Sequence, residues 1–159
     1  MRPALLGLLA ALAASGPAAA QDRCADFAWP LTRERTLLSE APAAENGATL
    51  PFGEARRIAA VPLAQAGLHA PPERGGPDIR AAHVQVDGAP ARIQVTLSDD
   101  AWVDVVQGGR HLRSLGSTGH RGCPGLRKSV RFDTGGAPFA VQVSGPDLRE
   151  MAIAVTAAQ

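Results

Sequence analysis

The fold class is decided by residues 81–107, which read AAHVQVDGAPARIQVTLSDDAWVDVVQ in this chain of 159 residues. Within this stretch, valine, isoleucine and leucine alternate with polar residues, which is the period of a β-strand with one buried face. Two turn-forming segments, Asp87-Gly88 and Ser98-Asp99-Asp100, interrupt the alternation. We therefore predict three successive strands joined by short turns.

The same pattern continues towards the C-terminus. Gly108-Gly109 joins two extended runs, which is typical of a tight β-hairpin because its turn needs positive φ. Seven alternating segments follow one another in all: 82–86, 93–97, 101–106, 110–115, 129–132, 139–143 and 151–155. The series predicts an all-β fold, an antiparallel β-sandwich of jelly-roll type, and a partly closed barrel would give the same pattern.

The first 20 residues have the three parts of a secretory signal peptide. Arg2 supplies the positive start, residues 4–14 form an uncharged apolar run, and Ala18-Ala19-Ala20 offers small residues for cleavage. A run of this length is too short to span a bilayer. We predict a periplasmic or secreted protein that is cleaved after Ala20 and has no transmembrane segment.

Two cysteines, Cys24 and Cys123, remain in the mature chain. An oxidising compartment favours pairing between them, and the absence of a Cys-x-x-Cys motif argues against a metal site or a redox dithiol. We predict one structural disulfide. A loop of this length would stabilise the fold by about 4 to 5 kcal/mol in the chain-entropy model.

The chain before the alternating segments is rich in alanine and proline and predicts one short helix. Thr32 is suited to cap this helix and residues 33–40 to form it, because Pro42 would end it. Three apolar residues are expected to dock this segment on the core beside the disulfide: Phe27, Trp29 and Leu31. The predicted organisation is a signal peptide (1–20), an N-terminal segment packed on the core (21–80) and the sandwich core (81–159).

Charges are unevenly distributed in the mature chain. Residues 21–104 hold 8 arginines against 12 acidic residues, whereas residues 105–159 hold 7 basic against 3 acidic residues. Six basic residues fall between Asp104 and Asp133 with no acidic residue among them: Arg110, Arg113, Arg121, Arg127, Lys128 and Arg131. Guanidinium groups suit phosphate and carboxylate, so the cluster predicts an anion-binding face. The alternative, which we favour, is that this face meets the acidic N-terminal half of the same chain.

Trp102 is the other candidate for ligand contact. It shares a strand face with Asp104, and an exposed tryptophan beside a carboxylate could stack on a sugar ring. The interpretation we favour is that Trp102 belongs to the core and is covered by the N-terminal segment, with Trp29 against it.

No catalytic residue, metal ligand or cofactor is predicted. The four histidines, His69, His83, His111 and His120, include no His-x-His pair of the kind that a cupin metal site uses, and His83 is expected to face solvent. The serine in Gly116-Ser117-Thr118-Gly119 lacks the Gly-x-Ser-x-Gly spacing of a hydrolase.

Two further features of the chain argue against other ligands. Glycine recurs at every third place from Gly116 to Gly125, which predicts a flexible loop that lets Cys123 reach Cys24 rather than a phosphate-binding loop. The balanced net charge and the lack of interleaved aromatic residues disfavour nucleic acid as a partner.

Three runs of sequence resemble uncharacterised small secreted or periplasmic β-rich proteins of Gram-negative bacteria. They are CADFAWPL at 24–31, AWVDVVQGG at 101–109 and GCPGLRKSVRF at 122–132. The strand rhythm of the C-terminal part is also similar to that of β-sandwich domains appended to secreted peptidases, which implies a fold alone. Neither resemblance implies an activity.

The function predicted from the sequence is therefore binding. We predict an exported, non-enzymatic β-sandwich that binds an anionic envelope component or a partner protein through its basic face. One alternative is a metal-dependent enzyme of cupin type, such as a ring-cleaving dioxygenase. Another alternative is an accessory domain of a secreted enzyme.

Overall fold

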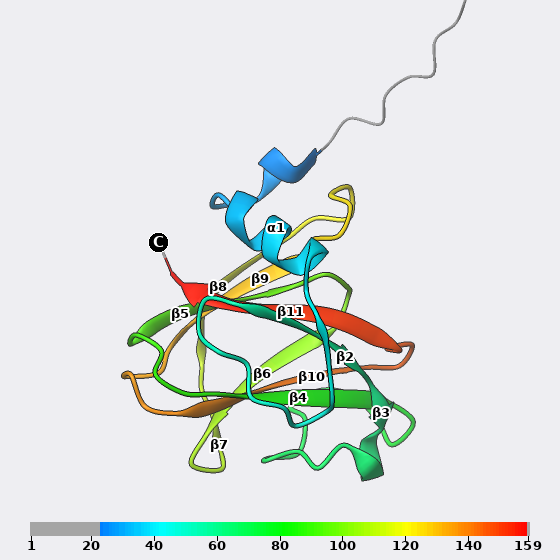
Figure 1. Ribbon diagram of the computed structural model, residues 1–159. Helices are drawn as coiled ribbons and strands as arrows, with labels where there is room; N and C mark the ends of the chain where they lie inside the picture. The colour runs from blue at the N-terminus through cyan, green and yellow to red at the C-terminus, as the bar shows by residue number, and fades with distance from the viewer. Residues whose placement is uncertain (1–22, 159) are drawn as a thin grey trace, which may run out of the picture.

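The computed structural model describes residues 23–158, which form two stacked β-sheets with a helix across one of them (Figure 1). In spatial order, the six-stranded sheet consists of β1 (Ala43–Ala44), β2 (Ala55–Ala59), β11 (Glu150–Ala157), β5 (Arg92–Leu97), β9 (Lys128–Asp133) and β8 (Ser114–Gly119). The five-stranded sheet consists of β3 (Val61–Pro62), β4 (Arg80–Val86), β10 (Phe139–Gly145), β6 (Trp102–Gln107) and β7 (Arg110–His111). Except for β1 with β2, the paired strands are antiparallel, which confirms the predicted β-sandwich.

The core lies between the two sheets and is mainly aliphatic, as the alternation predicts, with Phe132 and Phe139 also buried in it. Val95 of β5 lies opposite Val130 of β9 and Val155 of β11, and these side chains point inward from the six-stranded sheet. Val84 of β4 and Val141 of β10 are opposite one another in the facing sheet and are fully buried. Burial of these apolar side chains is the main force that holds the sheets together.

The first part of the N-terminal segment, residues 23–41, lies on the outer face of the six-stranded sheet. Helix η1 (Arg23–Asp26) and helix α1 (Thr32–Ser39) lie over this sheet in Figure 1. Phe27, Leu31 and Leu38 are buried there against Ala152 and Ala154 of β11, which confirms that this segment docks on the sandwich.

Helix α1 differs in detail from its prediction. Its N-cap is Leu31, which makes no side-chain capping bond, so Thr32 is the first helical residue rather than the cap. The helix carries a buried carboxylate that the sequence analysis did not single out. Glu34 is 2% exposed and accepts hydrogen bonds from Gln94 of β5 and Thr156 of β11, which fixes the helix on the sheet.

The predicted disulfide is present between Cys24 of η1 and Cys123, in the loop between β8 and β9. It ties the N-terminal segment to the far edge of the six-stranded sheet. Among the described residues, no helix has the length and apolar character needed to cross a bilayer. The predicted signal peptide lies outside the described residues.

Two parts of the predicted strand series are wrong in detail. The expected strand 110–115 is divided, because β7 pairs with β6 in one sheet whereas β8 pairs with β9 in the other. The chain therefore changes sheets at Leu112 and Arg113. The expected glycine-rich loop begins later than predicted, because residues up to Gly119 belong to β8. The hairpin at Gly108-Gly109 is confirmed, since both glycines have positive φ (56° and 75°).

The segment before Arg80 contributes strands as well as a helix. β2 pairs with β11, and β3 pairs with β4, so this segment extends both sheets. A short 3-10 helix, η2 (Leu63–Gln65), follows β3 and leads the chain beneath the five-stranded sheet in the view of Figure 1.

Candidate functional site

A row of polar side chains crosses the outer face of the five-stranded sheet. Gln142 of β10 lies directly opposite His83 of β4 on one side and Asp104 of β6 on the other. Their strand neighbours, such as Val84 and Val105, fill the core, so the alternation turns these three polar residues away from it. The sequence pattern predicts this orientation correctly.

Residues 66–74, which we call the crossing segment, cover this row. The backbone N–H groups of His69 and Ala70 donate to Gln142 Oε1 at 2.6 and 3.2 Å, and Gln142 Nε2 donates to the carbonyl of Ala70 at 2.9 Å. Further along, the N–H of Glu73 donates to Asp104 Oδ2 at 3.2 Å. The crossing segment is thus hydrogen-bonded to side chains of neighbouring strands.

Coverage by this segment corrects one prediction. His83 was expected to face solvent, yet it is 8% exposed. Its backbone N–H donates to Asn46 Oδ1, and the ring lies edge-on to the His69 ring with 5.2 Å between centroids. Alternation shows that a side chain leaves the core, but it does not show whether water or another segment meets it there.

Burial and the neighbouring His69 ring lower the pKa of His83 below its usual value, while a hydrogen bond with the backbone of Ala66 acts in the opposite direction. A histidine that is harder to protonate when folded destabilises the fold as the pH falls below its unfolded pKa of about 6.5.

We expect the free energy of unfolding to fall on acidification from pH 8 to pH 5, and we expect His83→Gln to weaken this dependence on pH. Urea titrations across this range measure it. His120→Gln should leave the dependence in place, and equal curves for wild type and His83→Gln would contradict the assignment.

Trp102 does not belong to the core, so the interpretation favoured from the sequence is wrong. The ring is 43% exposed at the start of β6. Trp29 lies instead on the outer face of the six-stranded sheet, where the guanidinium carbon of Arg131 is 3.9 Å from its ring centroid. Trp102 instead has two cationic neighbours, Arg74 of the crossing segment at 4.3 Å and Lys128 of β9 at 5.1 Å from its centroid.

Trp102 borders a hollow of about 580 Å³ at one end of the sandwich. Two basic side chains, Lys128 and Arg149, line this hollow. Its lining also includes four carboxylates: Asp99, Asp100, Asp147 and Glu150. Lys128 Nζ donates to the carbonyl of Ala101 at 2.7 Å, and burial lowers the pKa of this lysine. The hollow therefore combines an aromatic ring with a surplus of hydrogen-bond acceptors.

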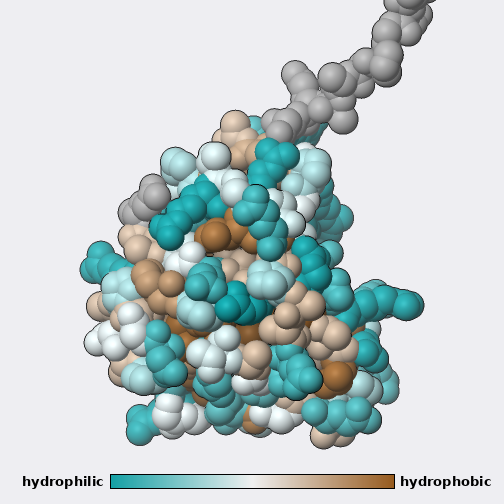
Figure 2. Space-filling model, viewed as in Figure 1, coloured by the Kyte–Doolittle hydropathy of each residue, from teal (hydrophilic) through white to brown (hydrophobic). Residues whose placement is uncertain are grey.

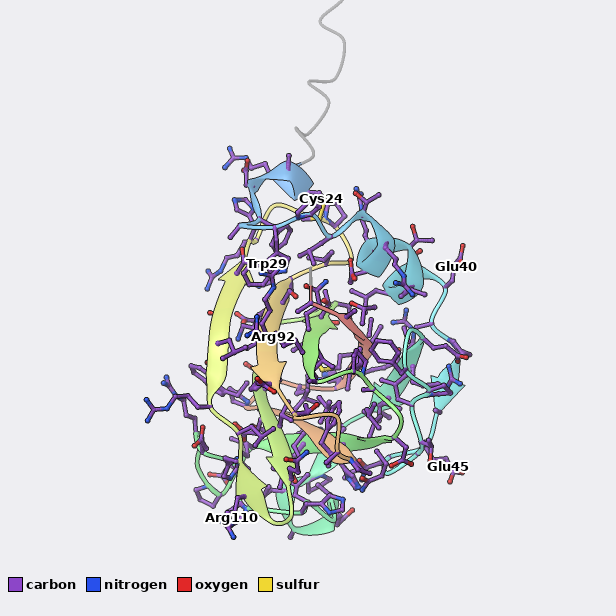
Figure 3. All side chains as sticks on the ribbon, turned by 90° about the vertical axis from the view of Figure 1, so that its left-hand side faces the viewer. Cys24, Trp29, Glu40, Glu45, Arg92 and Arg110 are labelled. Carbon is purple, nitrogen blue, oxygen red and sulfur yellow. A yellow bond between two sulfur atoms is a disulfide. The ribbon has the colours of Figure 1, made fainter. Side chains whose placement is uncertain are left out.

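The six residues of the predicted basic face are not gathered on one surface. Arg110 lies on β7 at the opposite end of the molecule from Cys24 (Figure 3), whereas Arg121 lies in the loop beside the disulfide. Arg127 pairs with Asp100 at 3.0 Å, and Arg131 lies against Trp29 on the six-stranded sheet. Arg113 is exposed where the chain changes sheets.

The alternative for the basic residues receives some support from the ion pairs. Arg127–Asp100 and His120–Asp26 each join a basic residue of the C-terminal part to an acidic residue of the N-terminal part. Arg131 is covered by the N-terminal segment too, although by an aromatic ring rather than by a carboxylate. The charge asymmetry of the sequence is thus used partly within the fold.

No protein-family model, curated protein or solved structure matches this chain. The resemblance to small secreted β-rich proteins therefore stays a prediction. The surface gives one further guide. The face shown in Figure 2 is mostly hydrophilic, with small and separated hydrophobic spots, so this face offers no broad apolar area to a protein partner.

The sequence analysis did not identify Gln142 or Glu73 as site residues. A signal was available for Gln142, because a polar residue stands at an outward position in each of three strands that prove to be neighbours: His83, Asp104 and Gln142. Glu73 lies in a proline-rich loop, where its composition predicts solvent exposure and nothing about which strands it crosses.

Proposed function

We propose that this protein is an exported, non-enzymatic binding protein that holds a saccharide part of an envelope component in the hollow beside Trp102. The observation that carries the proposal is the exposed Trp102 ring at the rim of a hollow of about 580 Å³. An exposed tryptophan in a concave site is a platform on which the apolar face of a sugar ring can stack.

The charges of the hollow favour a polyhydroxylated ligand over an anion. Four carboxylates line the hollow against two basic residues, Lys128 and Arg149. Asp100 also pairs with Arg127, which lies outside the lining. Carboxylate oxygens accept hydrogen bonds from sugar hydroxyls, whereas phosphate would be repelled. We therefore keep the predicted binding of an envelope component, but we propose that the ligand binds in the hollow beside Trp102 and not at the dispersed basic residues.

The neighbouring cations position the ring. Arg74 and Lys128 both lie within cation–π distance of Trp102, and such contacts limit the rotamers that the indole can adopt. A ring that is held in place before binding loses less conformational entropy when the ligand stacks on it.

Export is supported by the leader pattern and by the Cys24–Cys123 disulfide, a bond that persists in the periplasm or outside the cell. The ligand would then be part of the cell envelope, such as peptidoglycan or the saccharide of lipopolysaccharide.

The test is co-sedimentation of the mature protein with purified peptidoglycan sacculi and, in parallel, with smooth lipopolysaccharide. Trp102→Ala should weaken binding by about 5- to 150-fold if stacking of a sugar ring contributes as much as stacking of a nucleobase on an aromatic side chain, which is about 1 to 3 kcal/mol. Trp29→Ala is the matched control on the opposite sheet and should bind like wild type. Absence of binding by wild type to both materials would overturn the proposal.

The same assay separates the basic residues from the hollow. Arg110→Glu combined with Arg113→Glu should leave binding unchanged, because neither residue lines the hollow beside Trp102. If this charge reversal abolished binding while Trp102→Ala did not, the ligand would be an anion bound through the basic residues.

A further inference from the structure

Three side chains with metal-ligating atoms meet where the crossing segment reaches the edge of the five-stranded sheet. Glu73 of the crossing segment, Asp104 of β6 and His111 of β7 place one ligand atom each within 4.8 Å of one another. Asp104 and His111 follow Glu73 by 31 and 38 residues in the chain. The three side chains are therefore brought together by the fold and not by their spacing in the sequence. None of the three residues lines the hollow beside Trp102, although Glu73 and Asp104 share a smaller neighbouring hollow of about 170 Å³ with Trp102 and Lys128.

His111 is oriented as a metal ligand. Its Nε2 lies 2.9 Å from the carbonyl oxygen of Pro71, and a carbonyl can only accept, so Nε2 carries the hydrogen. Nδ1 is buried and has no hydrogen-bond partner in the described part of the chain. A ring that donates one N–H to a backbone carbonyl and keeps the other nitrogen unpaired is the usual arrangement of a ligating histidine.

Asp104 is a buried carboxylate that forms no ion pair within the described part of the chain. It is 8% exposed, and its recorded hydrogen bond is the one from the N–H of Glu73 to Oδ2. Burial raises its pKa above the usual value. Arg74, which follows Glu73 in the chain, lies against Trp102, and its charge acts to lower the pKa of Asp104, but it forms no ion pair with Asp104 or Glu73 among the described residues.

We propose that Glu73, Asp104 and His111 bind one divalent transition-metal ion, of the class of Zn²⁺ or Mn²⁺. Two carboxylates and one imidazole suit these ions, whereas Mg²⁺ and Ca²⁺ prefer sites made of oxygen alone. The ligand atoms of a tetrahedral zinc ion lie about 3.4 Å apart, so the three ligand atoms, which lie within 4.8 Å of one another, would need to approach by about 1.4 Å at most.

The ion would keep an open coordination position. Three protein ligands leave room for water or a ligand group, and the three residues line a hollow of about 390 Å³ together with Arg113 and Ser114. The ion would also link the crossing segment to β6 and β7. This proposal does not depend on saccharide binding.

The experiment is isothermal titration of the mature, tag-free and EDTA-treated protein with ZnCl₂ and with MnCl₂, with MgCl₂ as the comparison. We expect one ion per chain for zinc or manganese, and binding at least about 10-fold weaker for MgCl₂. Glu73→Gln, Asp104→Asn and His111→Gln should each weaken binding by more than about 10-fold. Glu45→Gln and His120→Gln are the matched controls and should bind like wild type.

The outcomes are decisive in both directions. Absence of stoichiometric zinc and manganese binding by wild type would overturn the proposal, and so would unchanged binding by Glu73→Gln. Because Glu73 is exposed, its variant keeps the test valid if substitutions at the buried Asp104 impair folding. An equal loss in the two control variants would identify the ion as bound nonspecifically at surface carboxylates and histidines, which also overturns the proposal.

Discussion

Replacement of Cys24 and Cys123 by serine together should lower the free energy of unfolding by about 4 to 5 kcal/mol. The disulfide closes a loop with a sequence separation of 99 residues, and its removal releases that constraint from the unfolded chain. Urea denaturation of wild type and the double variant at neutral pH measures the difference. Substitution of both cysteines avoids a free thiol that could form intermolecular bonds.

The disulfide prediction also has a spatial part. Because the bond fixes η1 to the loop between β8 and β9, hydrogen exchange in the double variant should rise first in η1 and α1, which rest on the outer face of the six-stranded sheet. Reducing agent should destabilise wild type to the level of the variant and leave the variant itself unchanged. A loss below about 1 kcal/mol would show that the N-terminal segment is held by packing alone.

Gln142→Leu should lower the free energy of unfolding by about 3 kcal/mol. The side chain is 2% exposed and satisfies the N–H groups of His69 and Ala70 and the carbonyl of Ala70. Each buried backbone group left without a partner costs about 1 to 3 kcal/mol, and partial access of water to the crossing segment reduces the sum. Urea denaturation gives the total, and hydrogen exchange at Ala70 reports the local opening.

Ser144 provides the matched control on the same strand and the same face. Its Oγ is buried without a hydrogen-bond partner in the described part of the chain, so Ser144→Ala removes no recorded bond and should change stability by less than about 0.5 kcal/mol. If both variants lost the same stability, packing on β10 would account for the effect and the hydrogen bonds to the crossing segment would not.

The sandwich could be predicted from the sequence because its signal is local. Alternating segments such as 93–97 and 151–155 became β5 and β11, and the glycine pair at 108–109 became the turn between β6 and β7. The disulfide could be predicted from the number of cysteines and from the expected oxidising compartment, because two cysteines allow a single pairing. These predictions depend on residues that are neighbours in the sequence or on the number of cysteines, and none of them requires knowledge of the strand order.

The site could not be predicted because it depends on what covers each outer face. His83 and Trp102 both point away from the core, yet the crossing segment, which precedes both in the chain, buries one and leaves the other exposed. The dispersal of the basic residues has a related cause. The chain changes sheets at Leu112 and Arg113, which separates Arg110 from Arg131, and no local pattern marks that crossing.

The position of β11 has a consequence for the order of assembly. This last strand lies between β2 and β5, in the interior of the six-stranded sheet, so β2 has no antiparallel partner until residues 150–157 have been synthesised. A nascent chain of this topology stays open until its end emerges. If the protein is exported as an extended chain, as we propose, the late pairing of β11 would delay closure of the six-stranded sheet during translation.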